Sequence, residues 1–490
     1  MASLQVLEEE AEGFCRASAQ ALAEAATGHA PKADLAAVER AHPLLVSPDT
    51  VAAVEAAVHS PRTRAVHRAR LAALLPFLRR VAVEAEARPA EEALQTALLS
   101  STVRTAGEVH PLLKAWAAVA EETDTARRRA LARATADAEL ALLGAVQRRW
   151  EAVQTATRSL GVPASPPAAG LLAEARDFLK TTEDGWRDVL GYACRKLSPE
   201  LRPLPGGDAG YEVLLRLVDS PLPGAFPPAE CLPALRRWLA ASGLTLEAEG
   251  RVRLDERGAG GLPEAACFLV EVPERVLLVL PPRGHGSFPA LLEAAGRARA
   301  AASVPASAPF GARRLGDASV GASAGALFRN VLTSAPWLRR FFSLGKAPAR
   351  EVARLAALAR LGELRAASAR LSWAATQADV GPSLPQLKGL AATLTEALCL
   401  DVPLGAVLPG FMGSPREAET LQAAALAECL EASADERFDA EDFRNPSAAR
   451  WLATVWARGA ELDAGALAKE LGGALSLAAV GRRLLTVLGA

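Results

Sequence analysis

The chain has 490 residues, 50% of them hydrophobic, which is enough to bury a substantial core in roughly two to four domain-sized units. Its 55 Lys and Arg residues nearly balance 56 Asp and Glu residues, and both signs are interspersed along the sequence, so neither nucleic acid nor an anionic membrane is expected as a partner. No stretch offers about 18 uncharged apolar residues, the first residues are acidic, and the 6 cysteines form no C-x-x-C pair. We therefore expect a cytoplasmic protein with reduced thiols. The heavy use of Ala, Leu, Arg and Pro is typical of high-GC bacterial genomes.

The first 160 residues predict helices almost throughout. Leu71, Leu74, Leu75 and Leu78 have the spacing that puts one apolar stripe on a helix. Residues 126–154 predict one long continuous helix with charges opposite its apolar face. Prolines then interrupt the pattern between 161 and 170, after which helices resume.

The only clear β region lies between residues 251 and 282. Segments 251–256, 266–272 and 275–282 are short and rich in Val and Leu, which predicts three strands. Helical periodicity then returns and continues to the C-terminus, with an interruption rich in Pro and Gly at 401–415.

From this β region onward the sequence resembles the thimet oligopeptidase and oligoendopeptidase family of zinc peptidases. In residues 265–302, "AACFLVEVPERVLLVLPPRGHGSFPALLEAAGRARAAA" has the family's order of strand, Pro-Arg-Gly turn and helix. Residues 313–341, "RRLGDASVGASAGALFRNVLTSAPWLRRF", resemble the family's next helix and the Trp-Leu pair that follows it. The segments 408–438 and 452–473 resemble its C-terminal helices, so the resemblance covers roughly residues 210–475.

The resemblance implies a mainly α fold, with two lobes of packed helices around a deep cleft and a small β ribbon beside the former zinc helix. It divides the chain into an N-terminal helical lobe, residues 1–200, and an oligopeptidase-like region, residues 201–490, which contains the ribbon at 251–282.

The family binds zinc through an H-E-x-x-H helix and a glutamate on the following helix, and here all of these positions differ. Aligned on Gly296, the two histidine positions hold Glu293 and Arg297, the general-base position holds Ala294, and the third ligand position holds Ala322. A guanidinium has no lone pair to give a metal, so we expect neither zinc nor another cofactor. No two histidines of the chain are four residues apart, so a shifted alignment does not restore the motif.

Together, the residues at these four positions are chemically consistent with a site that holds no metal. Ala294 and Ala322 remove carboxylates that would be uncompensated without the cation. Glu293 and Arg297 are four residues apart and could form an ion pair where the two histidines stood. The family also uses tyrosine hydroxyls on its C-terminal helices and loop, but the only tyrosines here, Tyr192 and Tyr211, lie outside the segments that match those helices.

Five residues are candidates for binding a ligand: Arg283, His285, Glu293, Arg297 and Arg313. For each, a structural ion pair, a solvated surface or an ordinary loop position is the simpler interpretation. Carboxylate recognition by a guanidinium is the functional interpretation of the arginines.

Three functions remain open. The first is a catalytically inactive peptidase homologue that binds a peptide or a protein partner, an active paralogue among the candidates. The second is a metal-independent or otherwise atypical peptide hydrolase, and the third is a helical scaffold with a closed cleft.

Overall fold

The computed structural model describes residues 3–105, 107–162, 169–219, 224–255, 264–280, 287–377, 380–412, 416–438, 445–459 and 461–489. These residues are mainly α-helical with two small β-sheets, which confirms the predicted fold class. No helix among them is both long and apolar enough to cross a lipid bilayer.

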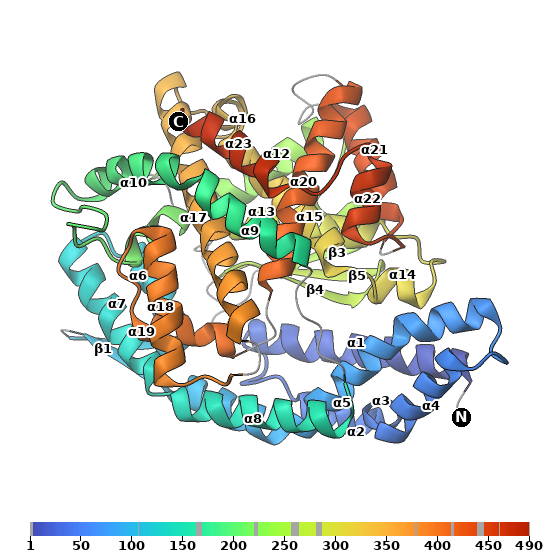
Figure 1. Cartoon of the computed structure of the whole chain (residues 1–490). Coiled ribbons are helices and arrows are strands. Elements are labelled where there is room, and N and C mark those ends of the chain that lie inside the picture. Colours follow the sequence, from blue (N-terminus) through green and yellow to red (C-terminus); the bar gives the residue numbers. More distant parts are fainter. Residues whose placement is uncertain are drawn as a thin grey trace.

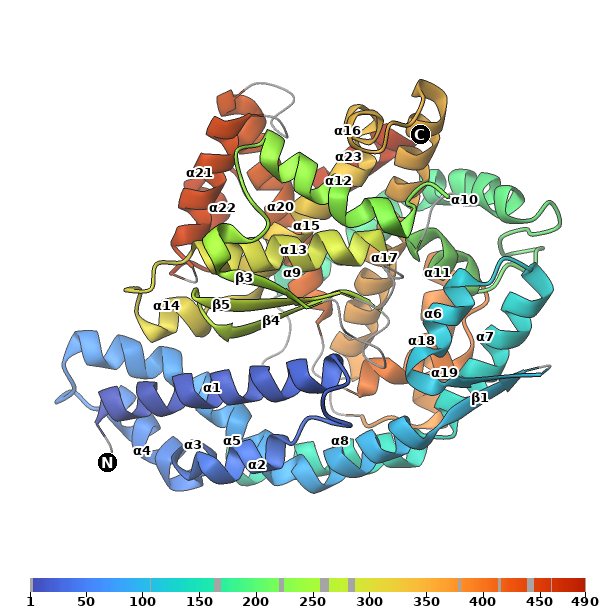
Figure 2. The ribbon, with the colours of Figure 1, turned by 180° about the vertical axis from the view of Figure 1, so that it is seen from behind.

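The N-terminal helices form a layer along one side of the molecule, blue to cyan in Figures 1 and 2. The predicted leucine stripe lies on the 36-residue helix α5, where Leu71, Leu74, Leu75 and Leu78 are all buried. They pack in a core with α1, α3 and α4. The helices of this part are α1 (Leu4–Ala26), α2 (Leu35–Ala41), α3 (Pro43–Val46), α4 (Pro48–His59), α5 (Ala65–Ser100), α6 (Leu112–Glu121), α7 (Thr125–Leu140) and α8 (Leu143–Ser159).

Two predictions for this part are wrong. An antiparallel hairpin of β1 (Thr102–Thr105) and β2 (Glu108–Pro111) interrupts the helices, so the β region near residue 270 is not the only one. The expected continuous helix over 126–154 is broken between α7 and α8. Helical periodicity does not reveal this break, because Ala141 and Leu142 both keep right-handed helical backbone angles while the hydrogen-bonding pattern changes.

The predicted strands 251–256, 266–272 and 275–282 form a three-stranded sheet. They are observed as β3 (Val252–Asp255), β4 (Ala266–Glu271) and β5 (Arg275–Val279), in the order β3-β5-β4. β5 pairs in parallel with β3 and antiparallel with β4. In both ribbon views the sheet lies between helix α13 (Phe288–Ser303) on one side and α1 on the other.

Several of the remaining helices pack around α17 (Lys346–Gln377), which runs through the middle of the molecule (Figure 1). Its buried leucines join the largest core, to which segments from Leu94 to Leu488 contribute, and the buried alanines near its start join a second core. The other helices are α9 (Ala169–Thr181), α10 (Glu183–Leu197), α11 (Glu212–Asp219), α12 (Pro228–Ala241), α14 (Phe310–Arg314), α15 (Ala318–Asn330), α16 (Ala335–Phe341), α18 (Leu384–Leu398), α19 (Leu404–Val407), α20 (Glu417–Phe438), α21 (Pro446–Ala457), α22 (Ala464–Glu470) and α23 (Leu477–Leu488).

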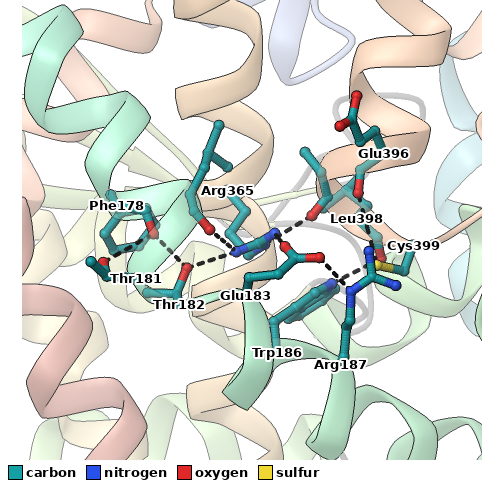
Figure 3. Close-up of polar contacts among 12 residues, drawn as sticks. Phe178, Thr181, Thr182, Glu183, Trp186, Arg187, Arg365, Glu396, Leu398 and Cys399 are labelled. Carbon is teal, nitrogen blue, oxygen red and sulfur yellow. Dashed lines mark hydrogen bonds and ion pairs between the residues drawn. The ribbon is translucent and has the colours of Figure 1, made fainter.

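A buried arginine fixes α17 to its neighbours (Figure 3). The guanidinium of Arg365 donates to the carbonyl oxygens of Leu179 and Ala397, both at 2.8 Å, and to the Thr182 hydroxyl at 2.7 Å. It also forms an ion pair with Glu183. Because its acceptors belong to α9, the start of α10 and α18, this one side chain connects three elements to the middle of α17.

Candidate functional site

Helix α13 carries the positions at which the resemblance would put a metal site. Ser287 caps it by accepting from the Ala290 backbone N–H at 3.4 Å, and Pro289 occupies its first turn. The helix is buried over most of its length because it lies between the three-stranded sheet and α15. Its side chains therefore have fixed directions, which is what a binding site requires.

Helices α13 and α15 are in direct backbone contact at two glycines. A Cβ atom on Gly296 would lie 2.3 Å from the carbonyl oxygen of Ala324, and one on Gly325 would lie 2.7 Å from the carbonyl oxygen of Glu293. Only residues without a side chain allow this approach. The contact places Glu293 beside the residues that follow Gly325 on α15.

Four charged side chains from three helices form the Glu293 cluster, which consists of Glu293, Arg329, Arg360 and Glu363. Arg329 of α15 donates to Glu293 at 2.8 Å and also forms an ion pair with Glu363 of α17. Arg360 of α17 lies 3.6 Å from Glu293 and 3.8 Å from Glu363. Two positive and two negative charges thus compensate one another.

The ion pair expected between Glu293 and Arg297 is replaced by these contacts. Glu293 turns towards the arginines of α15 and α17, and Arg297 pairs instead with Glu419 of α20 at 3.5 Å. The physical reason is that Arg329 and Arg360 are about nine-tenths buried and need a counter-charge, whereas the half-exposed Arg297 is solvated by water.

The cluster sets the protonation of its members. Burial would raise the pKa of Glu293, but Arg329 and Arg360 outweigh it and hold that pKa below its ordinary value. Burial lowers the pKa of Arg360, and the neighbouring Arg329 lowers it further. Close by, burial and the charge of Glu363 raise the pKa of Glu264. Glu293 is therefore an anion held by two cations.

The cluster forms part of the wall of a pocket of about 400 Å³, the α13 pocket. This size lies within the range of about 300–1,000 Å³ that is usual for ligand sites. Three of the positions singled out from the sequence, Glu293, Arg297 and Ala322, line it together. The other described lining residues are Tyr211, Leu214, Leu215, Val218, Ala326, Arg329, Arg360, Glu363, Ala366, Ala367, Arg370, Arg416, Glu417, Thr420 and Ala423.

The other candidate residues lie elsewhere. Ala294 is buried on α13 and does not line the pocket. Arg313 lies on α14, outside the pocket, where it donates to the Val272 carbonyl at 3.0 Å and pairs with Glu12 at 3.1 Å. Arg283 and His285 lie outside the described residues.

Sequence reasoning missed several residues of the pocket. Arg329 lies seven residues after Ala322, so the helical period places both on one face of α15, and this signal could have found it. Arg360 and Glu363 come from α17 and carry no local signal that connects them to α13. Tyr211, which lies outside the segments that resemble the family's C-terminal helices, lines the pocket from the position just before α11.

The chemistry of these side chains does not fit a zinc ion. Zinc requires several neutral or anionic donors in a tetrahedral arrangement. Here Ala322 offers no donor, and the carboxylate of Glu293 is already neutralised by two guanidinium groups that would repel a divalent cation. Among the described residues, no group of three or more His, Cys, Asp and Glu side chains could hold a metal.

The fold itself is found in known peptidases. PZ peptidase A, solved with an inhibitor, has a TM-score of 0.61 and 12% identity, and the match covers 91% of this chain and 85% of that one. A carboxypeptidase from Deinococcus radiodurans has a TM-score of 0.59 and 12% identity, and the match covers 99% of both chains. The chain shares the fold of these peptidases. A protein described as an oligoendopeptidase F from Bacillus anthracis gives a TM-score of 0.60 and 12% identity, over 90% of this chain and 82% of the other. The sequence matches no protein-family model and no curated protein sequence.

Proposed function

We propose that this chain is a peptidase homologue without metal or hydrolytic activity, and that it binds a peptide or an extended segment of a protein partner in the α13 pocket. The observation that carries the proposal is the Glu293 cluster. At the positions where the resemblance expects metal ligands, two buried arginines neutralise the one remaining carboxylate on α13. A metal-bound water, the nucleophile of zinc peptidases, has no set of donors there.

The pocket beside the cluster supports binding. Its volume of about 400 Å³ favours an open cleft over a scaffold whose cleft is filled. Leu214, Leu215 and Val218 offer apolar surface next to the charged groups. A combination of apolar wall and fixed polar groups is what recognises a peptide side chain and its neighbours.

Three measurements on the purified full-length chain test the proposal. Plasma mass spectrometry after incubation with zinc is expected to find far less than one metal ion per chain, and a library of internally quenched peptides is expected to remain uncut. A peptide array is expected to yield binders. Stoichiometric zinc together with peptide hydrolysis would overturn the proposal.

A pair of matched variants assigns the binding to the pocket. Thr420→Trp places a large ring at a half-exposed position of the pocket wall, whereas Thr454→Trp places the same ring on exposed α21, outside the pocket. Binders from the array should lose affinity for the first variant and keep it for the second. Equal affinity for both variants would place the binding surface elsewhere.

A further inference from the structure

The charges that line the α13 pocket are unequal. Its described lining includes five arginines and three glutamates, and the glutamates are Glu293, Glu363 and Glu417. Arg329 and Arg360 are compensated within the Glu293 cluster. Three arginines and one glutamate, Glu417, remain in the lining, so its remaining charge is positive and favours an anionic ligand.

Two of the remaining arginines have no counter-ion of their own. Within the part of the chain that the structure describes, neither Arg370 nor Arg416 forms an ion pair, although both line the pocket. Arg370 is half-buried on α17, and Arg416 is exposed immediately before α20. The third, Arg297 of α13, is 43% exposed and has only a long contact of 3.5 Å with Glu419.

These three arginines come from α13, α17 and the residue just before α20, and they line one pocket. A guanidinium offers several N–H donors in a planar fork that matches a carboxylate, so arginines held apart on separate elements suit a ligand that carries more than one carboxylate. Three small apolar residues, Ala366, Ala367 and Ala423, also line the pocket. A peptide main chain can approach these residues closely because their side chains are short.

We infer that the α13 pocket selects acidic peptides, and that Arg370 and Arg416 bind their side-chain carboxylates. This inference rests on the proposed function, since it names the class of peptide that the same pocket takes. The Glu293 cluster then acts as a rigid, neutral part of the wall. The selectivity belongs to the arginines that the cluster leaves uncompensated.

The test compares two capped peptides by isothermal titration calorimetry. One is acetylated and amidated Ala-Glu-Ala-Glu-Ala, and the other has Gln in place of each Glu, so the two differ only in side-chain charge. The acidic peptide should bind the wild-type chain at least about tenfold more tightly, because a hydrogen bond between a guanidinium and a carboxylate is stronger than one between a guanidinium and an amide. Its affinity should fall as salt is added.

Three variants complete the experiment. Arg370→Gln and Arg416→Gln should each weaken the acidic peptide by about tenfold and leave the Gln peptide unchanged. Arg133→Gln, on the exposed face of α7, makes the same change in net charge away from the pocket and should have no effect. Because Arg416 is exposed, its replacement tests the inference even if Arg370→Gln does not fold.

The possible results separate this inference from the proposed function. Equal affinity for both peptides would overturn the acidic selectivity while peptide binding stands. Binding of neither peptide, together with an empty peptide array, would overturn both. Acidic preference that Arg133→Gln reduces as much as Arg416→Gln would overturn the assignment to the pocket and indicate a general charge effect.

Discussion

Removing Arg329 provides the most direct test of the Glu293 cluster. In Arg329→Met the methylene stem is largely kept, while the guanidinium that contacts Glu293 at 2.8 Å and also pairs with Glu363 is lost. Arg360 is then the only arginine of the cluster, at 3.6 Å and 3.8 Å from the two carboxylates. Two close negative charges would share one more distant cation.

The magnitude follows from the burial of the cluster. Removing one partner of a buried ion pair costs about 3–5 kcal/mol. The side chains of Glu293 and Glu363 keep 32% and 26% exposure, so water compensates part of the loss, and we expect the lower end, about 3 kcal/mol at pH 7. The pKa of Glu293 lies below its ordinary value, so its stabilising contribution is present above that value and is lost as the pH falls through the lower pKa of the folded state. The cost of Arg329→Met should therefore shrink in acid.

Urea denaturation at pH 7 and pH 4, followed by tryptophan fluorescence and circular dichroism, measures this cost. The chain has several hydrophobic cores, so the two signals must coincide before midpoints are converted into free energies. Adding Glu293→Gln to Arg329→Met should recover part of the loss at pH 7. Arg133→Met on exposed α7 is the matched control and should change stability by no more than about 0.5 kcal/mol. A cost below about 1 kcal/mol at pH 7, or an equal cost at both pH values, would refute this account of the cluster.

Three further changes have defined outcomes. Gly296→Ala should lower the thermal midpoint strongly, because a Cβ there would lie 2.3 Å from a carbonyl oxygen and overpacking costs about 1–3 kcal/mol or more. Gly321→Ala on α15 is the control: its Cβ meets open space, so this variant should be neutral or more stable. Equal midpoints for the two variants would contradict the tight contact. Burial raises the pKa of Glu139 from 4.5 to about 7, so the folded chain loses about 3 kcal/mol of stability as the pH rises through this interval. Glu139→Gln should abolish this loss, which urea titrations at pH 5 and pH 8 measure. An unchanged pH dependence in the variant would contradict the raised pKa of Glu139. Arg365→Met leaves several buried acceptors unpaired and should lower the free energy of unfolding by at least about 3 kcal/mol in the same assay. A decrease of less than about 1 kcal/mol would show that the contacts in Figure 3 contribute little to stability.

The sequence predicted the parts of the fold that repeat locally. The leucine stripe of α5 and the three Val- and Leu-rich strands have periodic patterns that extend over several residues, and the structure contains both. The hairpin of β1 and β2 was missed because each of its strands has only four residues, too few for an alternating pattern to stand out. The break after Leu140 was missed because the one glycine beside it, Gly144, is isolated, and an isolated glycine is tolerated within a helical pattern.

The pocket was predicted in part. Spacing on α13 and the expected order of helices brought Glu293, Arg297 and Ala322 to one place. The predicted ion-pair partner of Glu293, Arg297, was wrong because arginines of two other helices compete for the same carboxylate. Arg297 is closer in sequence, but Arg329 and Arg360 are more deeply buried and gain more from a counter-charge. Burial depends on the whole fold, so a sequence alone does not rank these three arginines.

Because α13 and α15 contact each other through the main chain at two glycines, their positions do not depend on the side chains that line the pocket. Two main chains that already touch have no room to move closer, and the glycines give them no side chains to push them apart. Substitutions at the pocket surface therefore change which ligands the pocket binds, while the two helices keep their positions. Such a frame can lose one chemistry and acquire another through a few substitutions, without having to be rebuilt.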